Sequence, residues 1–412
     1  MPFLSLLDDR AKPKGSRDPL GFELVWTHYG RQIIGNLTTI TSSLGNFAAA
    51  LLGFHWANEI HGHLPEYDRQ SQVRDTFLRY EQLAGYLRYL AGDEAIMGIT
   101  RVRRRMDETN ASVGFGLGAN QTILSDQASY GLWGLYSAAM RDTGLVRGDS
   151  RIPTDPGAEI AREIGKELDG TKNRLIDLFT TGRQVRKEVL EPLSNPFHSA
   201  INREPVKDIL LHALMRGSGH KVLQQELWRV TQNLAESGAS VINVPGFIAQ
   251  VRDRTKLPEL KRQLTEIEQV ERILVAANNI FHYCRRKDGE PIDAVVSVLS
   301  NRYSYAHLPD TFTFQDVPRP DLLTAIYKAL LSNDMGDALT NVLTLNRVVM
   351  EQRGGVPWVE VENGETLRVR VQSEVAELRK QGHLETGWDY DYFIGSFIRM
   401  AGEGLGVTWT AR

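Results

Sequence analysis

Three histidines and one glutamate between residues 55 and 63 have the spacing in this chain that comes closest to a metal site. His55 and Glu59 are four residues apart, so a helix would place both side chains on one face. Two histidines and one carboxylate can hold zinc or iron and leave a coordination position open. One hypothesis is therefore a metal-dependent hydrolase or nuclease built on His55, Glu59, His61 and His63.

The same residues also fit a structural explanation. His61 and His63 flank Gly62 and precede Pro65, where we expect the helix to end. Histidines at that end of a helix complement its dipole. No HExxH pattern or other ligand set is complete in the sequence. The favoured interpretation therefore has no bound metal and no cofactor.

The densest basic run of the chain consists of Arg101, Arg103, Arg104 and Arg105. Four guanidinium groups could neutralise several phosphates and give strongly salt-dependent binding to DNA. Asp107 and Glu108 follow directly, so a solvated helix face is the alternative. We keep the four arginines as candidate nucleic-acid contacts.

Residues 125–164 have the pattern of a helix, a short hairpin and a second helix. Ser125 and Asp126 can cap a helix, and Gly144 suits its C-terminal end. Two short strands are expected on either side of the turn at residues 147–150. Thr154 then caps the second helix, with Pro156 in its first turn. Arg147 and Arg151, which lie at this turn, are therefore expected to be held in place by the two flanking helices.

This order of elements, with Gly-Leu-Val before the hairpin and Thr-x-Pro-Gly after it, resembles the wing and following helix of many bacterial winged-helix domains. The resemblance covers about 40 residues. It implies a winged-helix-like module in which Arg147 and Arg151 contact DNA. Trp133, Tyr136 and Tyr130 stand on the helix that would enter the major groove, where Arg, Asn and Gln usually read bases. A protein–protein module is therefore the alternative.

The rest of the chain is predicted to be mainly helical. Stripes of apolar residues begin at Leu37 and Val73, and the longest runs from Leu260 to Cys284 within a predicted helix over 258–287. A helix of this length suggests a spine, or a scaffold that dimerises through it. The glycines at 114, 116 and 118 are interpreted as a flexible break before the module.

The predicted fold class is mainly α: a multi-helix bundle with an embedded winged-helix-like module and a small C-terminal β-hairpin and helix. The expected domains are 1–115 (N-terminal helical domain), 120–166 (winged-helix-like module), 167–350 (helical domain containing the long helix) and 355–412 (hairpin plus helix). The aromatic segment from Trp388 to Phe397 is expected to form a helix packed on the hairpin.

The register of the C-terminal hairpin can be predicted. A two-residue turn at Asn363 and Gly364 would pair Val359 with Arg368, placing apolar against charged side chains on one face. A three-residue loop over 362–364, with Gly364 left-handed, would pair Val359 with Leu367 and keep the valines together. We predict the longer loop.

Composition limits the class of protein. The net charge of −3 argues against a wholly basic nucleic-acid coat, and the single cysteine, Cys284, excludes a disulfide framework and fits a reducing cytoplasm. The longest apolar run, residues 47–54, is far shorter than the roughly 20 residues of a membrane span. We expect a cytoplasmic protein without membrane contact.

These observations favour a non-enzymatic accessory subunit of a bacterial multi-protein DNA-related system, such as anti-phage defence, restriction or chromosome maintenance. It would contact DNA or a partner protein through region 101–164. The metal-dependent hydrolase on residues 55–63 and the dimeric helical scaffold are the alternatives. Genomic neighbours would discriminate between them, because a subunit's role is commonly evident from the genes beside its own.

Overall fold

Two groups of packed helices make up the computed structural model, which describes residues 18–217, 222–373 and 378–411. Unit 1 consists of the described residues up to Gln32 together with Pro258–Tyr392, and unit 2 consists of Ile33–Leu257 and the residues from Phe393 onward. The mainly α prediction is confirmed, since the described strands form only three two-stranded sheets. No helix in the described ranges has both the length and the hydrophobicity needed to span a membrane.

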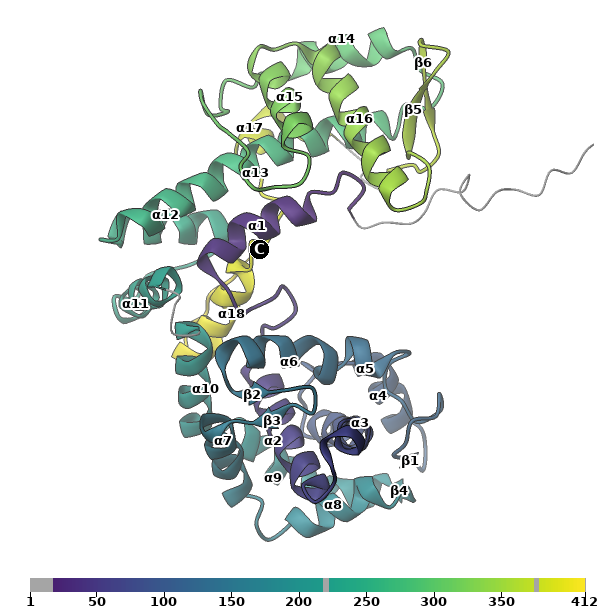
Figure 1. Cartoon of the computed structure of the whole chain (residues 1–412), viewed down its shortest axis with the longest axis vertical. Coiled ribbons are helices and arrows are strands. Elements are labelled where there is room, and N and C mark those ends of the chain that lie inside the picture. Colours follow the sequence, from purple (N-terminus) through teal and green to yellow (C-terminus); the bar gives the residue numbers. More distant parts are fainter. Residues whose placement is uncertain (1–17, 218–221, 374–377, 412) are drawn as a thin grey trace, which may run out of the picture. The chain divides into compact units, whose positions relative to one another are not determined.

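Unit 1 is built around one long helix, as Figure 1 shows. Its elements are α1 (Glu23–Ile33, whose last residue belongs to unit 2), α13 (Pro258–Cys284), α14 (Ile292–Arg302), α15 (Pro320–Leu331), α16 (Met335–Gln352), β5 (Val359–Glu362), β6 (Thr366–Val369) and α17 (Gln381–Glu385). The prediction of a long helix is confirmed, although α13 ends three residues early. Its apolar stripe, including Leu264, Leu274 and Cys284, is buried in the core of unit 1. The face predicted for dimerisation is therefore already covered within the chain.

The β5–β6 hairpin has a loop of the predicted length in a different place. The loop consists of Asn363, Gly364 and Glu365, and Val359 pairs with Val369 rather than with Leu367. Asn363 and Gly364 both have positive φ (53° and 77°), and the Glu365 amide donates to the Glu362 carbonyl at 3.1 Å. This is the turn that Asn-Gly favours in hairpins, with Glu365 as an extra residue. The predicted register was wrong by two residues, a shift that keeps the valines on one face.

Unit 2 surrounds the helices α2 and α3 (Figure 1). Its elements are α2 (Leu44–His61), α3 (Glu66–Leu90), α4 (Ile99–Met106), β1 (Ser112–Gly114), α5 (Gln127–Tyr130), α6 (Leu132–Thr143), β2 (Val146–Arg147), β3 (Ile152–Pro153), α7 (Asp155–Lys166), α8 (Lys172–Thr180), β4 (Gln184–Arg186), α9 (Lys187–Ile201), α10 (Glu204–Arg216), α11 (Val222–Glu236), α12 (Val244–Arg254) and α18 (Ile394–Leu405). The stripe from Val73 to Leu87 on α3 is buried as predicted. The stripe that begins at Leu37 is not helical before Leu44, because Ser43 caps α2 by accepting a hydrogen bond from Asn46 N.

The glycine-rich segment at residues 114–118 is not the flexible break that the sequence suggested. Strand β1 pairs with β4, and Phe115 is fully buried. The Gln82 side chain donates to Gly116 O at 2.8 Å and accepts from Gly116 N at 3.1 Å. Because one buried amide satisfies both backbone groups, this segment is held against α3.

The predicted helix from Ser125 to Gly144 is divided at Gly131. The buried Glu81 carboxylate accepts hydrogen bonds from Leu132 N at 2.6 Å and from Gln127 Nε2 at 2.8 Å. It therefore caps the start of α6 from the neighbouring helix α3. Asp126 caps α5 by accepting from Ser129 N at 3.0 Å. Burial raises the pKa of Glu81 to about 7.

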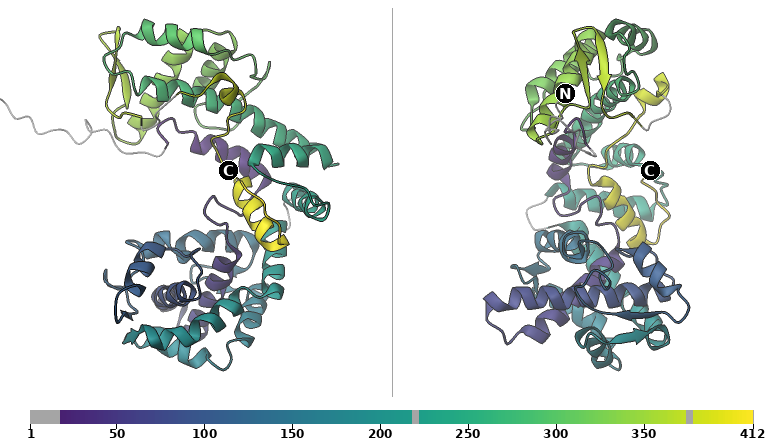
Figure 2. Two further views of the ribbon diagram at one scale, coloured as in Figure 1. Left: turned by 180° about the vertical axis from the view of Figure 1, so that it is seen from behind. Right: turned by 90° about the vertical axis from the view of Figure 1, so that its right-hand side faces the viewer.

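The aromatic segment from Trp388 to Phe397 does not form one helix, contrary to the prediction: residues 388–392 are non-helical and belong to unit 1, and α18 begins only at Ile394 in unit 2. The hairpin lies beside α16 in unit 1. Figure 2 shows the chain from two further directions, in the same colours. Helix α18 belongs to unit 2, where Phe397 and Ile398 are fully buried among residues of α10, α11 and α12. The four domains expected along the sequence thus do not coincide with the two units, because segments far apart in sequence share each core.

Two glycines of α7 predict opposite effects of the same substitution. A Cβ atom on Gly157 would lie 2.0 Å from the Leu145 carbonyl oxygen, whereas a Cβ on Gly165 would meet no atom within 4 Å. We expect Gly157→Ala to lower the free energy of unfolding by about 1–3 kcal/mol. Gly165→Ala should raise it by about 0.5–1 kcal/mol, the usual gain in a helix. Urea denaturation followed by circular dichroism measures both, and shifts of the same sign would contradict the packing described.

Candidate functional site

The structure does not assemble the four candidate metal ligands around one point. His61 Nε2 forms a hydrogen bond with Thr76 Oγ1 at 2.7 Å, and both Glu59 oxygens accept from Lys172 Nζ at 2.9 Å. His55 is half-buried, and burial lowers its pKa. Among the described residues, no group of three or more His, Cys, Asp and Glu side chains is arranged to hold a metal ion. Glu59 and His61 instead connect α2 to its neighbours α8 and α3.

The four arginines of α4 divide into structural and exposed residues. Arg105 donates to Tyr86 Oη and to the Gln121 carbonyl, each at 2.8 Å, and Arg101 donates to the Thr122 carbonyl at 3.4 Å. Arg103 is exposed and pairs with Glu94 at 2.7 Å. Arg104 is exposed, and it is the one arginine of this helix whose side chain makes no hydrogen bond or ion pair within the described chain.

The β2–β3 hairpin is present where the sequence predicts it. Val146 pairs with Pro153 and Arg147 pairs with Ile152. Thr154 fixes the base of the hairpin, because its amide donates to Leu145 O at 3.0 Å and its hydroxyl donates to Gly144 O at 2.7 Å. Val146 is buried, so the hairpin is attached firmly to the helices beneath it.

Three arginines surround this hairpin, and we call Arg141, Arg147 and Arg151 the hairpin arginines. Arg141 and Arg147 are exposed, and neither forms an ion pair with a described residue. The Arg151 guanidinium lies 4.9 Å from the centre of the Trp133 ring and donates to Asp149 O at 2.7 Å. Burial, and secondly the nearby charge of Arg141, lowers the pKa of Arg151. The Asp149 carboxylate lies 3.8 Å from the Arg151 guanidinium and offsets part of this repulsion. Arg141 and Arg151 still place like charges close together, an arrangement that a bound anion would stabilise.

Helix α6, which precedes the hairpin, does not present a face that could read bases. The Trp133 ring packs against Phe54 and Phe77, with ring centroids 5.6 and 5.5 Å away. Tyr136 packs against Phe47 at 4.8 Å and accepts a hydrogen bond from Asn46 Nδ2 at 2.9 Å. Trp133 and Tyr136 are therefore core residues of unit 2, whereas Tyr130, the third aromatic residue expected on the groove-reading helix, lies in α5 and is 62% exposed.

The two groups of candidate arginines lie on elements that pack against different parts of unit 2. Helix α4 packs on α3 and β1, whereas the β2–β3 hairpin packs on α2, α6 and α7. In Figure 1, α4 and the hairpin lie at opposite ends of α6. The six arginines predicted as one nucleic-acid contact are therefore two separate groups.

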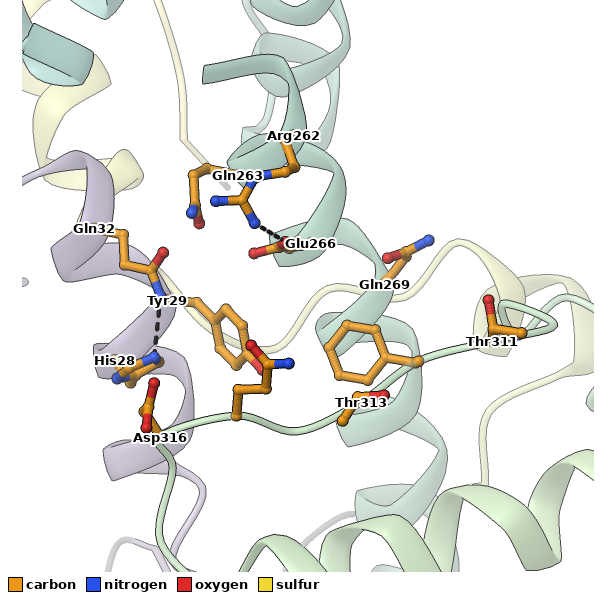
Figure 3. Close-up of a pocket in the computed structure, with 12 residues that line it drawn as sticks. His28, Tyr29, Gln32, Arg262, Gln263, Glu266, Gln269, Thr311, Thr313 and Asp316 are labelled. Carbon is orange, nitrogen blue, oxygen red and sulfur yellow. Dashed lines mark hydrogen bonds and ion pairs between the residues drawn. The ribbon is translucent and has the colours of Figure 1, made fainter. Parts of the chain in front are cut away.

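Unit 1 contains a polar cleft that the sequence did not predict, and we call it the Tyr29 cleft (Figure 3). Its volume is about 490 Å³. It is formed by α1, α13 and the loop between α14 and α15, and its lining residues are His28, Tyr29, Gln32, Arg262, Gln263, Glu266, Gln269, Thr311, Phe312, Thr313, Gln315 and Asp316.

Hydrogen bonds and ion pairs fix part of the lining of the Tyr29 cleft. His28 Nε2 and Gln32 Nε2 lie 3.0 Å apart. Arg262 pairs with Glu259 at 2.6 Å and also with Glu266. Asp316 has a φ of 55° and forms no hydrogen bond or ion pair with any described residue. Its carboxylate is therefore free to contact a ligand.

The residues of the Tyr29 cleft are distant in sequence, which explains why pattern analysis missed them. Glutamine and threonine carry no recognisable spacing, and α1 and α13 are more than 200 residues apart. The one local signal is the alternation of polar and aromatic residues over 311–316 in a loop without helical spacing.

No protein-family model, curated protein or solved structure matches the chain.

Proposed function

We propose that this protein is a non-enzymatic accessory subunit of a multi-protein DNA-related system and contacts the DNA backbone through the hairpin arginines. The observation that carries the proposal is the pair of exposed cations, Arg141 and Arg147, which have no ion-pair partner among the described residues. Arg147 and Arg151 belong to the β2–β3 hairpin, which is fixed to the helical core, and Arg141 lies near Arg151 in the last turn of α6. Guanidinium groups of this kind suit phosphate oxygens, which they can bind through two hydrogen bonds.

The contact we propose does not depend on DNA sequence. Bases are read by side chains that enter a groove, and the side chains of α6 that would do so are packed in the core. Arginines on a hairpin can instead bind phosphates along the side of a duplex. A protein of net charge −3 with three such residues binds DNA weakly by itself. This weakness favours a subunit that acts beside other DNA-binding chains.

Charge-removing substitutions on the hairpin test the proposal. We expect Arg141→Gln/Arg147→Gln to weaken binding of a fluorescent duplex and to reduce the slope of log K against log salt by about 2. Arg151 is left in place because its guanidinium stacks on Trp133. Fluorescence anisotropy at several salt concentrations from about 50 mM upward measures both quantities.

The control is the matched pair Arg103→Gln/Arg104→Gln on α4, which removes the same charge from the other group. This pair should change affinity and salt slope less than the hairpin pair does. Equal losses in the two variants would show only an effect of net charge and would defeat the assignment to the hairpin. Absence of binding by the wild-type protein at low salt would defeat the DNA contact itself and leave an acidic partner protein as the ligand of these arginines.

A further inference from the structure

We propose that the Tyr29 cleft binds a small organic cation, a ligand that carries a protonated amine. Two carboxylates, Glu266 on α13 and Asp316 on the loop before α15, belong to different walls of the same cleft. In Figure 3, the Glu266 and Asp316 side chains stand on opposite sides of Tyr29. This inference concerns unit 1 alone and does not depend on the proposed DNA contact.

The charge of the lining excludes anionic ligands. Arg262 is the one Lys or Arg residue that lines the cleft, and it is already paired with Glu259 and Glu266. Asp316 has no such partner among the described side chains. The cleft therefore retains negative charge, and a phosphate or carboxylate group would be repelled. A protonated amine would be attracted, and the concave site strengthens its attraction.

The pKa of Tyr29 is consistent with this negative charge in the cleft. Its pKa is raised to about 12, first by burial and then by the charges of Glu266 and Asp316. A backbone hydrogen bond from Gln315 acts in the opposite direction. The phenol thus stays protonated and neutral, and its oxygen can accept a hydrogen bond from an ammonium group.

The aromatic rings favour an amine over a flat heterocycle. The centroids of Tyr29 and Phe312 are 6.3 Å apart and their planes are inclined by 49°. Two rings so inclined cannot sandwich a planar base between parallel faces. An aromatic face beside carboxylates does suit a cation, because its quadrupole attracts positive charge.

The remaining lining residues would hold the rest of the ligand. Gln269, Thr311 and Thr313 each offer both donors and acceptors, so they can bind polar groups near the amine. A volume of about 490 Å³ lies within the range of small-molecule sites. The cleft is accordingly large enough for an amine that carries further polar groups.

A matched pair of probes tests the charge requirement. Isothermal titration calorimetry with the full chain compares 1,5-diaminopentane with 1,5-pentanediol, which has the same length without charge. We expect binding of the diamine, weakened by added salt, and none of the diol. Asp316→Asn should reduce the diamine affinity about 2- to 5-fold. Asparagine tolerates the left-handed backbone of this position, so the loop should be retained.

Asp310→Asn is the control, because Asp310 is exposed in the same loop and does not line the cleft. It should leave the affinity unchanged, and thermal melts of both variants should match that of the wild type. A further titration with N-acetyl-lysine amide distinguishes a free amine from a lysine side chain of a partner protein, according to which probe binds more tightly. Equal binding of diamine and diol, or equal losses in the Asp316 and Asp310 variants, would overturn the proposal.

Discussion

Replacing Glu271 with glutamine is expected to make the protein more stable at alkaline pH. Glu271 is fully buried in unit 1 and accepts hydrogen bonds from the amides of Asp389 and Tyr390 through Oε1. Its Oε2 lies 2.8 Å from Tyr392 Oη. A glutamine can reproduce this pattern, because its oxygen accepts from both amides while its nitrogen donates to the tyrosine oxygen.

The direction follows from the pKa of Glu271. Burial raises it from 4.5 to about 8, so the folded state binds a proton that the unfolded state has released. The stability contributed by this group is complete below pH 4.5 and is lost as the pH rises through about 8. At about 1.4 kcal/mol for each pKa unit, the loss reaches at most about 5 kcal/mol. The glutamine variant carries no such dependence.

Chemical denaturation at a series of pH values between 5 and 9 measures this effect. The advantage of Glu271→Gln over the wild type should grow with pH up to about 8 and then remain constant. Parallel profiles would contradict it. Glu81→Gln provides a contrast, because both oxygens of Glu81 accept from N–H donors. An amide there would set one NH₂ group against another, so this variant should be less stable than the wild type near neutral pH.

Arg88→Met is expected to lower the free energy of unfolding by about 3–5 kcal/mol. Arg88 is 2% exposed, which is unusual for an arginine. Its guanidinium donates to Asp93 Oδ2 at 2.8 Å, to Asn46 Oδ1 at 2.5 Å and to the Ala95 carbonyl at 3.0 Å. Methionine fills much of the same space but leaves these three acceptors without their donor, and the cost of such orphaned groups is high.

Two further variants separate charge pairing from packing. Arg104→Met removes an exposed arginine without a described partner and should change stability by less than about 0.5 kcal/mol. Arg88→Met/Asp93→Asn removes both charges of the buried pair and should recover part of the loss. Urea denaturation measures all three, and equal values for the Arg88 and Arg104 variants would show that the pair has no structural role.

The helices could be predicted because their apolar residues recur at helical spacing. Val73 through Leu87 on α3 and Leu260 through Cys284 on α13 are buried as that spacing requires. The errors came where tertiary contacts override local pattern. Glu81, which belongs to α3, accepts a hydrogen bond from Leu132 N and so divides the predicted helix at Gly131. Gln82, also on α3, holds the glycine-rich segment that the sequence suggested was flexible. Because Glu81 and Gln82 lie outside residues 114–144, the pattern of that segment alone could not predict their effect.

The candidate sites were predictable to different degrees. The β2–β3 hairpin and its arginines could be predicted because turn residues and helix caps are local signals. The different roles of Arg105 and Arg104 could not be predicted, because only Arg105 donates hydrogen bonds to the Gln121 and Thr122 carbonyls. The Tyr29 cleft depends on three segments meeting, a fact that spacing alone does not contain.

The order in which the chain enters and leaves its two units has a consequence for synthesis. Unit 1 begins before unit 2 and is completed after it, and α18 then returns to unit 2. The core around Phe397 and Ile398 therefore cannot close on a ribosome until α18 has emerged, after the whole of unit 1. Nascent chains stopped near residue 257 would expose the apolar surface that α18 covers, and they are the intermediates on which a chaperone would act.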